Sequence, residues 1–537
     1  MMQQGTGAQA DIAAMAQDDP GDDAAPSAQP RPGFNRSSLV RSALIVTRAT
    51  YVTYIAGLVV STLTARALGP HDYGRYSYVV WLSGLVVMGC TNGLTISGIK
   101  FVAERLGRGD GHGAAHVYQL LRRYFLYAAA ATTVATLVAL PFMQPHGWRG
   151  GFVFLAAVVL VSGLAKSLYL LHSSVAKGWG NFSIESNSTN LAGLLGVAAT
   201  GVLVLLRAPL DAFLLLFAVL GIVHLLLART FLRGTAIHPE PGTVDAETMR
   251  RLRIHLAWTI AQVLLATASN RTVETFLLNR TTGAEAVGYF IIAATLARSG
   301  AELLSSGLTA VLLPAMSHSY GQGGHARVNR LLSNAVRYFA FFGVLLAGVG
   351  ALASDLVVHL MYGAKYAPVA DVLKAMAIVA GLTLPEGAFN AVLIAVDQQR
   401  LRVMLTGVAV LLSACLALVL VPRFGLAGAV AGHVAARTIM FATMLLLSTF
   451  NLKMRLPWRA LGRQAACAAI ATLAAFALLA IHPGPWMAMA AAAVFAAAFC
   501  ACSIPLGVWE REDFAMLEPL SRRFPRLGAL LARVLPH

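Results

Sequence analysis

The chain contains little charge for its length. Only 12% of its 537 residues are charged, whereas 57% are hydrophobic, and the mean hydropathy is +0.68. A soluble core could not bury that much apolar surface, so the composition excludes a soluble enzyme and predicts a membrane protein. The net charge of +17 does not indicate nucleic-acid binding, because the basic residues form short clusters between apolar runs, where they orient a membrane protein.

Cysteine is scarce, and a cleavable signal peptide is missing. All five cysteines lie in apolar segments without metal-ligating neighbours, so we interpret them as packing residues and predict no metal site. Residues 1–38 are rich in Ala, Gln, Pro, Gly and Asp, and predict a disordered cytoplasmic tail. They lack a basic stretch followed by an apolar core, so the first apolar helix is expected to act as a signal anchor.

Apolar runs of about 20 residues, the length needed to cross a bilayer, recur from residue 43 to residue 508. They predict an all-α integral membrane protein with about fourteen transmembrane helices. The expected spans are 43–65, 75–97, 120–142, 152–174, 188–206, 210–231, 256–278, 287–311, 335–358, 370–395, 402–421, 426–449, 463–481 and 486–508.

The distribution of Lys and Arg predicts the orientation. If the amino end is cytoplasmic, the loops that follow even-numbered spans carry most basic residues, and both termini are cytoplasmic. Nearly all loops are short, and none could fold as a separate catalytic domain. We therefore assign no catalytic residue and predict that the protein is not an enzyme.

An internal repeat appears when the chain is shifted by 214 residues. "GLT" at 93–95 then aligns with "GLT" at 307–309, and "RYF" at 123–125 with "RYF" at 337–339, in one register over roughly seventy residues. The repeat predicts two pseudo-symmetric six-helix lobes around a central cavity, related by an axis along the membrane normal. The expected segments are a tail at 1–38, lobes at 39–232 and 256–450, a linker at 233–255, two extra transmembrane helices at 451–508 and a cytoplasmic tail at 509–537.

The stretch "RALGPHDYGRY" at 66–76 returns as "RTTGAEAVGYF" at 280–290. Gly69 can adopt the left-handed conformation that ends a helix, and Pro70 starts the next one. Gly74 would let two backbones approach closely, and Gly283 and Gly288 repeat the arrangement. We interpret this stretch as a duplicated structural corner rather than a binding loop.

Four segments together resemble a known family. They are "LTARALGPHDYGRYSYVV", "GIKFVAERLGRGD", "LLPAMSHSYGQGG" and "LMYGAKYAPV". They are similar to the bacterial polysaccharide transporters, flippases of lipid-linked oligosaccharides in the MOP (multidrug/oligosaccharidyl-lipid/polysaccharide) superfamily. The resemblance covers about residues 40 to 450 and specifies the substrate hardly at all.

The resemblance implies a flippase in the bacterial cytoplasmic (inner) membrane. Its substrate would be an undecaprenyl-diphosphate-linked oligosaccharide, moved by alternating access from the cytoplasmic to the periplasmic leaflet for capsule, exopolysaccharide or O-antigen synthesis. Expected partners are this substrate and membrane lipids, with a polymerase and glycosyltransferases as further candidates, and no nucleic acid. We expect no cofactor, although coupling to a proton or sodium gradient is open.

Charged residues inside predicted spans are the candidate site, because charges within a bilayer usually face a bundle interior or a wet cavity. Arg298, Glu302, Ser305 and Thr309 share one face of the eighth span. A cavity-lining pair that meets a diphosphate and a structural ion pair are both open interpretations of Arg298 and Glu302.

Other spans add further candidates. For substrate binding in the cavity they are Arg48, Lys166, Arg271, Arg298 and Asn390, and for ion coupling or ion pairing they are Glu274, Glu302 and Glu386. Arginine suits phosphate because its planar guanidinium offers a fork of donors. Arg48 could equally extend to the headgroups, and Glu274 could be a structural partner of Arg271. In the tenth span Thr383, Glu386 and Asn390 share a face next to Pro385, which permits a kink.

Three alternative functions remain open. A drug or cation antiporter of the same superfamily would share the fold, but its cavity should be rich in carboxylates and aromatic residues. A lipid II flippase is distinguished from the favoured function only by the family resemblance of the sequence. A membrane glycan polymerase is disfavoured by the short loops and the repeat.

Overall fold

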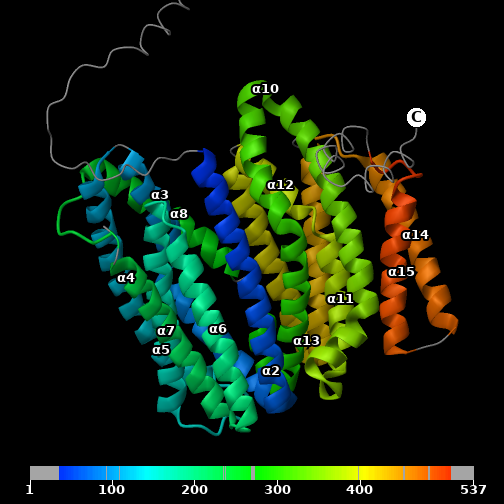
Figure 1. Ribbon diagram of the computed structural model, residues 1–537, viewed down its shortest axis with the longest axis horizontal. Helices are drawn as coiled ribbons and strands as arrows, with labels where there is room; N and C mark the ends of the chain where they lie inside the picture. The colour runs from blue at the N-terminus through cyan, green and yellow to red at the C-terminus, as the bar shows by residue number, and fades with distance from the viewer. Residues whose placement is uncertain are drawn as a thin grey trace, which may run out of the picture. The chain divides into compact units, whose positions relative to one another are not determined.

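The computed structural model describes residues 36–91, 93–107, 109–233, 235, 237–267, 273–396, 398–450, 454–481 and 484–509. Within these residues all regular structure is helical, which confirms the all-α prediction (Figure 1). The helices are α2 (Arg36–Thr91), α3 (Leu94–Gly107), α4 (Gly111–Ala139), α5 (Phe152–Gly178), α6 (Ser183–Leu205), α7 (Leu210–Arg233), α8 (Ala246–Thr267), α9 (Val273–Thr281), α10 (Ala284–Tyr362), α11 (Pro368–Leu382), α12 (Glu386–Ala395), α13 (Gln399–Phe450), α14 (Trp458–Ile481) and α15 (Pro485–Ser503), with short 3₁₀ helices at Leu140–Phe142 and Ala364–Tyr366.

Among the described residues, ten helices are long and apolar enough to cross a membrane, and an eleventh span is the bent pair α11 and α12. Two of the ten, Tyr51–Leu106 and Arg400–Phe450, are 56 and 51 residues long. Each contains a glycine with positive φ, Gly69 (φ 74°) or Gly425 (φ 56°), so each comprises two of the expected spans. The structure therefore supports a multi-pass membrane protein.

The seventh expected span differs from its prediction. Helix α8 begins at Ala246, ten residues before the predicted start at 256, and the span is divided between α8 and α9. Residues 268–272, which join them, lie outside the described residues, and Arg271 is one of these. The turns of α8 before residue 256 contain Arg250, Arg251 and Arg253, so hydropathy does not count them in the apolar run.

Helix α10 contains both the eighth and the ninth expected spans. Figure 1 shows it turning over near its label and running back. The two apolar parts are Ala284–Ser305 and Val328–Tyr362. The turn of α10 and the end of α15 lie at the same end of the bundle (Figure 1), as the predicted topology requires.

Two glycines have the predicted corner conformation. Gly69 has φ 74° and ψ 172°, and its repeat equivalent Gly283 has φ 108° and ψ 179° and precedes α10. Only glycine adopts such a conformation readily, so both corners break the helix at the same place in each repeat. The predicted close approach at Gly74 is also confirmed, because a Cβ there would lie 1.8 Å from the carbonyl oxygen of Ala284.

The short connection before α4 is fixed by a helix cap. The Asp110 carboxylate accepts a 2.7 Å hydrogen bond from the Gly113 N–H and pairs with Arg105 at 3.0 Å. The Gly113 N–H, together with Arg105, holds the pKa of Asp110 below its usual range. Such a side-chain cap satisfies one of the free N–H groups at a helix start.

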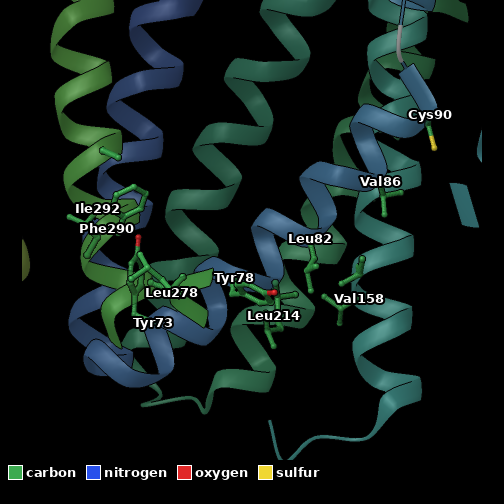
Figure 2. Close-up of a cluster of buried hydrophobic side chains, with 14 of the residues drawn as sticks. Tyr73, Tyr78, Leu82, Val86, Cys90, Val158, Leu214, Leu278, Phe290 and Ile292 are labelled. Carbon is green, nitrogen blue, oxygen red and sulfur yellow. The ribbon is translucent and has the colours of Figure 1, made fainter. Parts of the chain in front are cut away.

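Among the described residues, the buried apolar side chains form four clusters. The first joins residues from α2 to those of α9 and α10: Figure 2 shows Tyr73 beside Phe290, Ile292 and Leu278. The second lies within α10, α12 and α13, around Phe339. The third packs α14 and α15 against α10, and the fourth lies in α4 to α7. The first cluster therefore connects the two predicted lobes near their corners.

Candidate transport cavity

Two adjoining cavities lie among α10, α11, α12 and α13. The larger has a volume of about 400 Å³ and the smaller about 230 Å³. They adjoin because four residues line both, namely Glu386, Asn390, His433 and Arg437. All lining residues come from the predicted C-terminal lobe, so a contribution of the N-terminal lobe to a central cavity stays a prediction.

Helix α10 contributes the predicted polar stripe to the larger cavity. Arg298 donates from Nε to Oε1 of Glu302 at 2.6 Å, one turn away on the same helix. Their side chains are 54% and 34% exposed, so the pair is accessible from the cavity. Ser305 lines the same wall, whereas the side chain of Thr309 is outside the described residues. Alanines between these residues keep the wall open.

A second ion pair faces the same cavity from the opposite helices. Arg437 of α13 lies 2.8 Å from Oε2 of Glu386 and donates to the Thr383 hydroxyl at 3.4 Å. The bend of 42° between α11 and α12 lies between Thr383 and Glu386. The predicted kink at Pro385 is therefore confirmed, and it turns both side chains toward Arg437.

The smaller cavity has polar and apolar walls. Arg402, Thr406 and Ser413 of α13 line it together with methionines of the same helix. The Ser413 hydroxyl donates a 2.7 Å hydrogen bond to Oε1 of Glu274, which is only 1% exposed. Glu274 therefore lies behind the cavity wall and holds α9 to α13, while its predicted partner Arg271 is outside the described residues.

Lys166 lies elsewhere, and the side chain of Arg48 is not described. Lys166 is in α5, with its Nζ 4.5 Å from the centre of the Tyr169 ring, and it lines neither cavity. Tyr169 in turn contacts His224 of α7, with 5.2 Å between ring centres. Arg48 belongs to α2, but its side chain is outside the described residues. The structure thus brings together Arg298, Glu302, Glu386 and Asn390, but not Lys166.

The sequence prediction missed His433 and Arg402 as cavity residues. Both line the smaller cavity, and His433 lines the larger one as well. His433 precedes Arg437 by four residues, so helical spacing put both on one face and could have revealed it. Arg402 is the first residue of the expected span 402–421, where an arginine is typical of a membrane boundary, whereas α13 begins at Gln399 and includes it.

The cavity walls combine cations with neutral donors. Arg298, Arg402 and Arg437 line the two cavities against the carboxylates of Glu302 and Glu386. Asparagine, serine and threonine side chains supply further hydrogen-bonding groups. The arrangement can solvate a polyanion and the hydroxyl groups of a sugar without covalent chemistry. The described residues contain no group of three or more His, Cys, Asp or Glu that could hold a metal ion.

The comparisons with known proteins agree with this architecture. Residues 39–320 match the family model described as "Polysaccharide biosynthesis protein", which is more than half of the chain. The chain belongs to this family. No curated protein matches it.

Solved structures with the same fold are transporters. The "Lipid II flippase MurJ, inward closed conformation" is 12% identical, with a TM-score of 0.69 over 86% of this chain and 98% of that one. An inward-facing multidrug resistance transporter of the MATE family and MOP superfamily is 14% identical, with a TM-score of 0.58 over 75% and 94%. A MOP superfamily transporter from Pyrococcus furiosus is 15% identical, with a TM-score of 0.54 over 77% and 96%. The chain therefore has the fold of these transporters, and its family links it to polysaccharide biosynthesis.

Proposed function

We propose that the protein is a flippase that carries undecaprenyl-diphosphate-linked oligosaccharides from the cytoplasmic to the periplasmic leaflet of the bacterial inner membrane. The observation that carries the proposal is the pair of Arg–Glu contacts, Arg298–Glu302 and Arg437–Glu386, on the walls of one cavity. Family membership supports the link to polysaccharide synthesis. The proposal includes the identity of the lipid carrier, the direction of transport and the membrane in which the protein lies.

The physical demand on such a transporter is the diphosphate, which carries two or more negative charges through a medium of low dielectric constant. A phosphate oxygen about 4 Å from a guanidinium gains roughly 4 kcal/mol at an effective dielectric constant of about 20. In each pair the carboxylate would be displaced by phosphate, so the arginine remains paired before and after binding. The arginine is thus never left unpaired, and the displaced carboxylate is left to water in the cavity or to a proton.

The carboxylates account for release. When the substrate leaves, Glu302 and Glu386 return to their arginines and compete with phosphate for the same donors. Protonation of either carboxylate would remove this competition, so both are candidates for coupling to a proton or sodium gradient. Asn390, which lines both cavities, is proposed to bind sugar hydroxyl groups.

The test measures export in cells and inspects the trapped intermediate. Deletion should trap lipid-linked repeat units in the cytoplasmic leaflet, and Arg298→Ala or Arg437→Ala should reduce export at least about tenfold at normal protein abundance. Lys374→Ala is the matched control, because Lys374 also forms an ion pair in this lobe, at 2.9 Å from Asp355, but lines neither cavity.

The alternative functions give different results. Trapped units on the periplasmic side would indicate a polymerase, and accumulation of lipid II would indicate a lipid II flippase. Sensitivity of the deletion strain to organic cations, with normal glycan export, would indicate a drug antiporter. Normal export by both arginine variants would refute the role of the cavity.

A further inference from the structure

The two lobes are tied together at the corner end of the bundle by groups that cap helix ends. Arg66, just before the Gly69 corner, donates from Nε to the carbonyl oxygen of Met361 at 2.7 Å and also donates to Leu360. Both carbonyl groups belong to the last turn of α10, where no helical N–H is left to satisfy them. A cation there also complements the negative end of the helix.

Tyrosines complete this contact from the other side. The Tyr366 hydroxyl donates to the carbonyl oxygen of Ala65 at 2.7 Å, in the last turn before Gly69. The Tyr362 hydroxyl lies 3.2 Å from that of Ser61, which also contacts the Tyr73 hydroxyl at 2.8 Å. Each lobe therefore supplies groups that satisfy a helix end of the other.

The second repeat forms an equivalent contact. Asn279 donates from Nδ2 to the carbonyl oxygen of Gln144 at 2.9 Å and accepts from the His146 N–H at 2.8 Å. Position 279 is 214 residues after position 65, so the repeat relates Asn279 to Ala65. Asn279 binds the loop that follows the third span. Arg66 binds Leu360 and Met361, which lie at the equivalent place after the ninth span. The same ends of the two repeats therefore contact each other twice.

The axis that relates the repeats passes close to two equivalent glycines. A Cβ on Gly288 would lie 3.1 Å from the Cα of Gly74, its own counterpart 214 residues earlier. Two helices can cross this closely only where side chains are missing. A contact between equivalent residues marks a point on this axis at which the two lobes meet.

We propose that these contacts form the outer gate of the transporter. Arg66 is its principal latch, Asn279 forms a second contact between the lobes, and the Gly74–Gly288 crossing lets the two helices close against each other. The predicted topology places this end on the periplasmic side. The gate is shut in this structure, because a single apolar cluster joins the lobes here. The gate requires only that the protein is a transporter, so it is independent of which glycan is carried.

Cross-linking tests the gate directly. In a chain without its five native cysteines, Ser61→Cys with Tyr362→Cys should be joined by a short bifunctional thiol reagent and lose export, and cleavage of the linker should restore it. The matched control is Ser61→Cys with Tyr73→Cys, which spans a similar hydroxyl contact inside one lobe. Equal loss of export in both pairs, or full export by the locked pair, would overturn the proposal.

Labelling from outside tests the latch without any substrate. Arg66→Ala should raise the reaction of Ala65→Cys with a membrane-impermeant maleimide about tenfold, since a charged donor to two carbonyls is lost. Arg280→Ala is the control, because Arg280 is the exposed equivalent in the second repeat. Unchanged labelling in Arg66→Ala at normal abundance would refute the latch. Increased labelling of Arg66→Ala supports the gate whichever substrate is carried. The gate and the proposed substrate can therefore be refuted separately.

Discussion

Replacing Gly74 by alanine should force the outer end of the two lobes apart. The new Cβ would lie 1.8 Å from the carbonyl oxygen and 2.4 Å from the carbonyl carbon of Ala284. Both atoms are backbone, so no side chain can rotate away and a helix must move. Overpacking of this kind costs about 1–3 kcal/mol. Because that cost falls on the shut state alone, the population of the open state should rise about 5- to 150-fold.

The assay compares three glycines in the same background. Gly74→Ala should show the strongest maleimide labelling of Ala65→Cys, a position that is fully buried when the gate is shut. Gly288→Ala should show a smaller rise, because its Cβ would meet the nearest atom at 3.1 Å. Gly84→Ala should match the parent, since nothing lies within 4 Å of its added Cβ on the same helix α2.

Membrane abundance separates opening of the gate from a failure to fold. If Gly74→Ala is present at the parental level, labels like the parent and exports normally, the two helices do not need their close approach. That result would refute the role of the glycine crossing even if Arg66 acts as a latch. A variant that is absent from the membrane leaves Gly288→Ala to decide, because its clash is mild enough to be tolerated.

Three further outcomes follow from contacts elsewhere. Glu386→Gln should raise the affinity of the purified protein for a soluble prenyl diphosphate about five- to tenfold, because Arg437 loses a competing carboxylate, and unchanged calorimetric affinity would contradict this. Asp110→Ala should cost about 1 kcal/mol of stability in detergent by removing the cap of α4. Since its pKa is lowered in the folded state, the stabilisation by Asp110 should persist from neutral pH to pH 5 and disappear only below about pH 4, and loss already at pH 6 would contradict the assignment. Arg251→Glu should lower the unfolding temperature by reversing its 2.7 Å pair with Glu104, and Glu104→Arg should restore it, whereas no restoration would show that the pair is not coupled.

The local part of the candidate site could be predicted from the sequence. Arg298 and Glu302 are one helical turn apart, so helical periodicity alone placed them on one face and allowed them to pair. The kink beside Pro385 was likewise predictable, because proline cannot donate the hydrogen bond that a straight helix needs. These features depend on neighbouring residues along the chain, whose geometry is fixed once the helix forms.

The meeting of distant residues could not be predicted in this way. Arg437 pairs with Glu386 across two helices, and Glu274 receives a hydrogen bond from Ser413, 139 residues later. Each contact depends on how the helices cross and on the 42° bend between α11 and α12. The spacing of residues along the sequence contains no information about these angles. From the sequence alone, a carboxylate that holds two helices together, such as Glu274, could therefore not be distinguished from one that lines the cavity, such as Glu386.

The sequence by itself determined the membrane class, the repeat and the glycine corners. Apolar runs of membrane length have no other favourable environment, and only glycine takes the positive φ observed at Gly69 and Gly283. Only the tertiary structure decided that the corners of the two repeats touch each other at Gly74 and Gly288, and that the charged faces enclose a cavity in the second lobe. The physical reason is that helix formation follows from local periodicity and burial, whereas contact between lobes depends on packing over the whole chain.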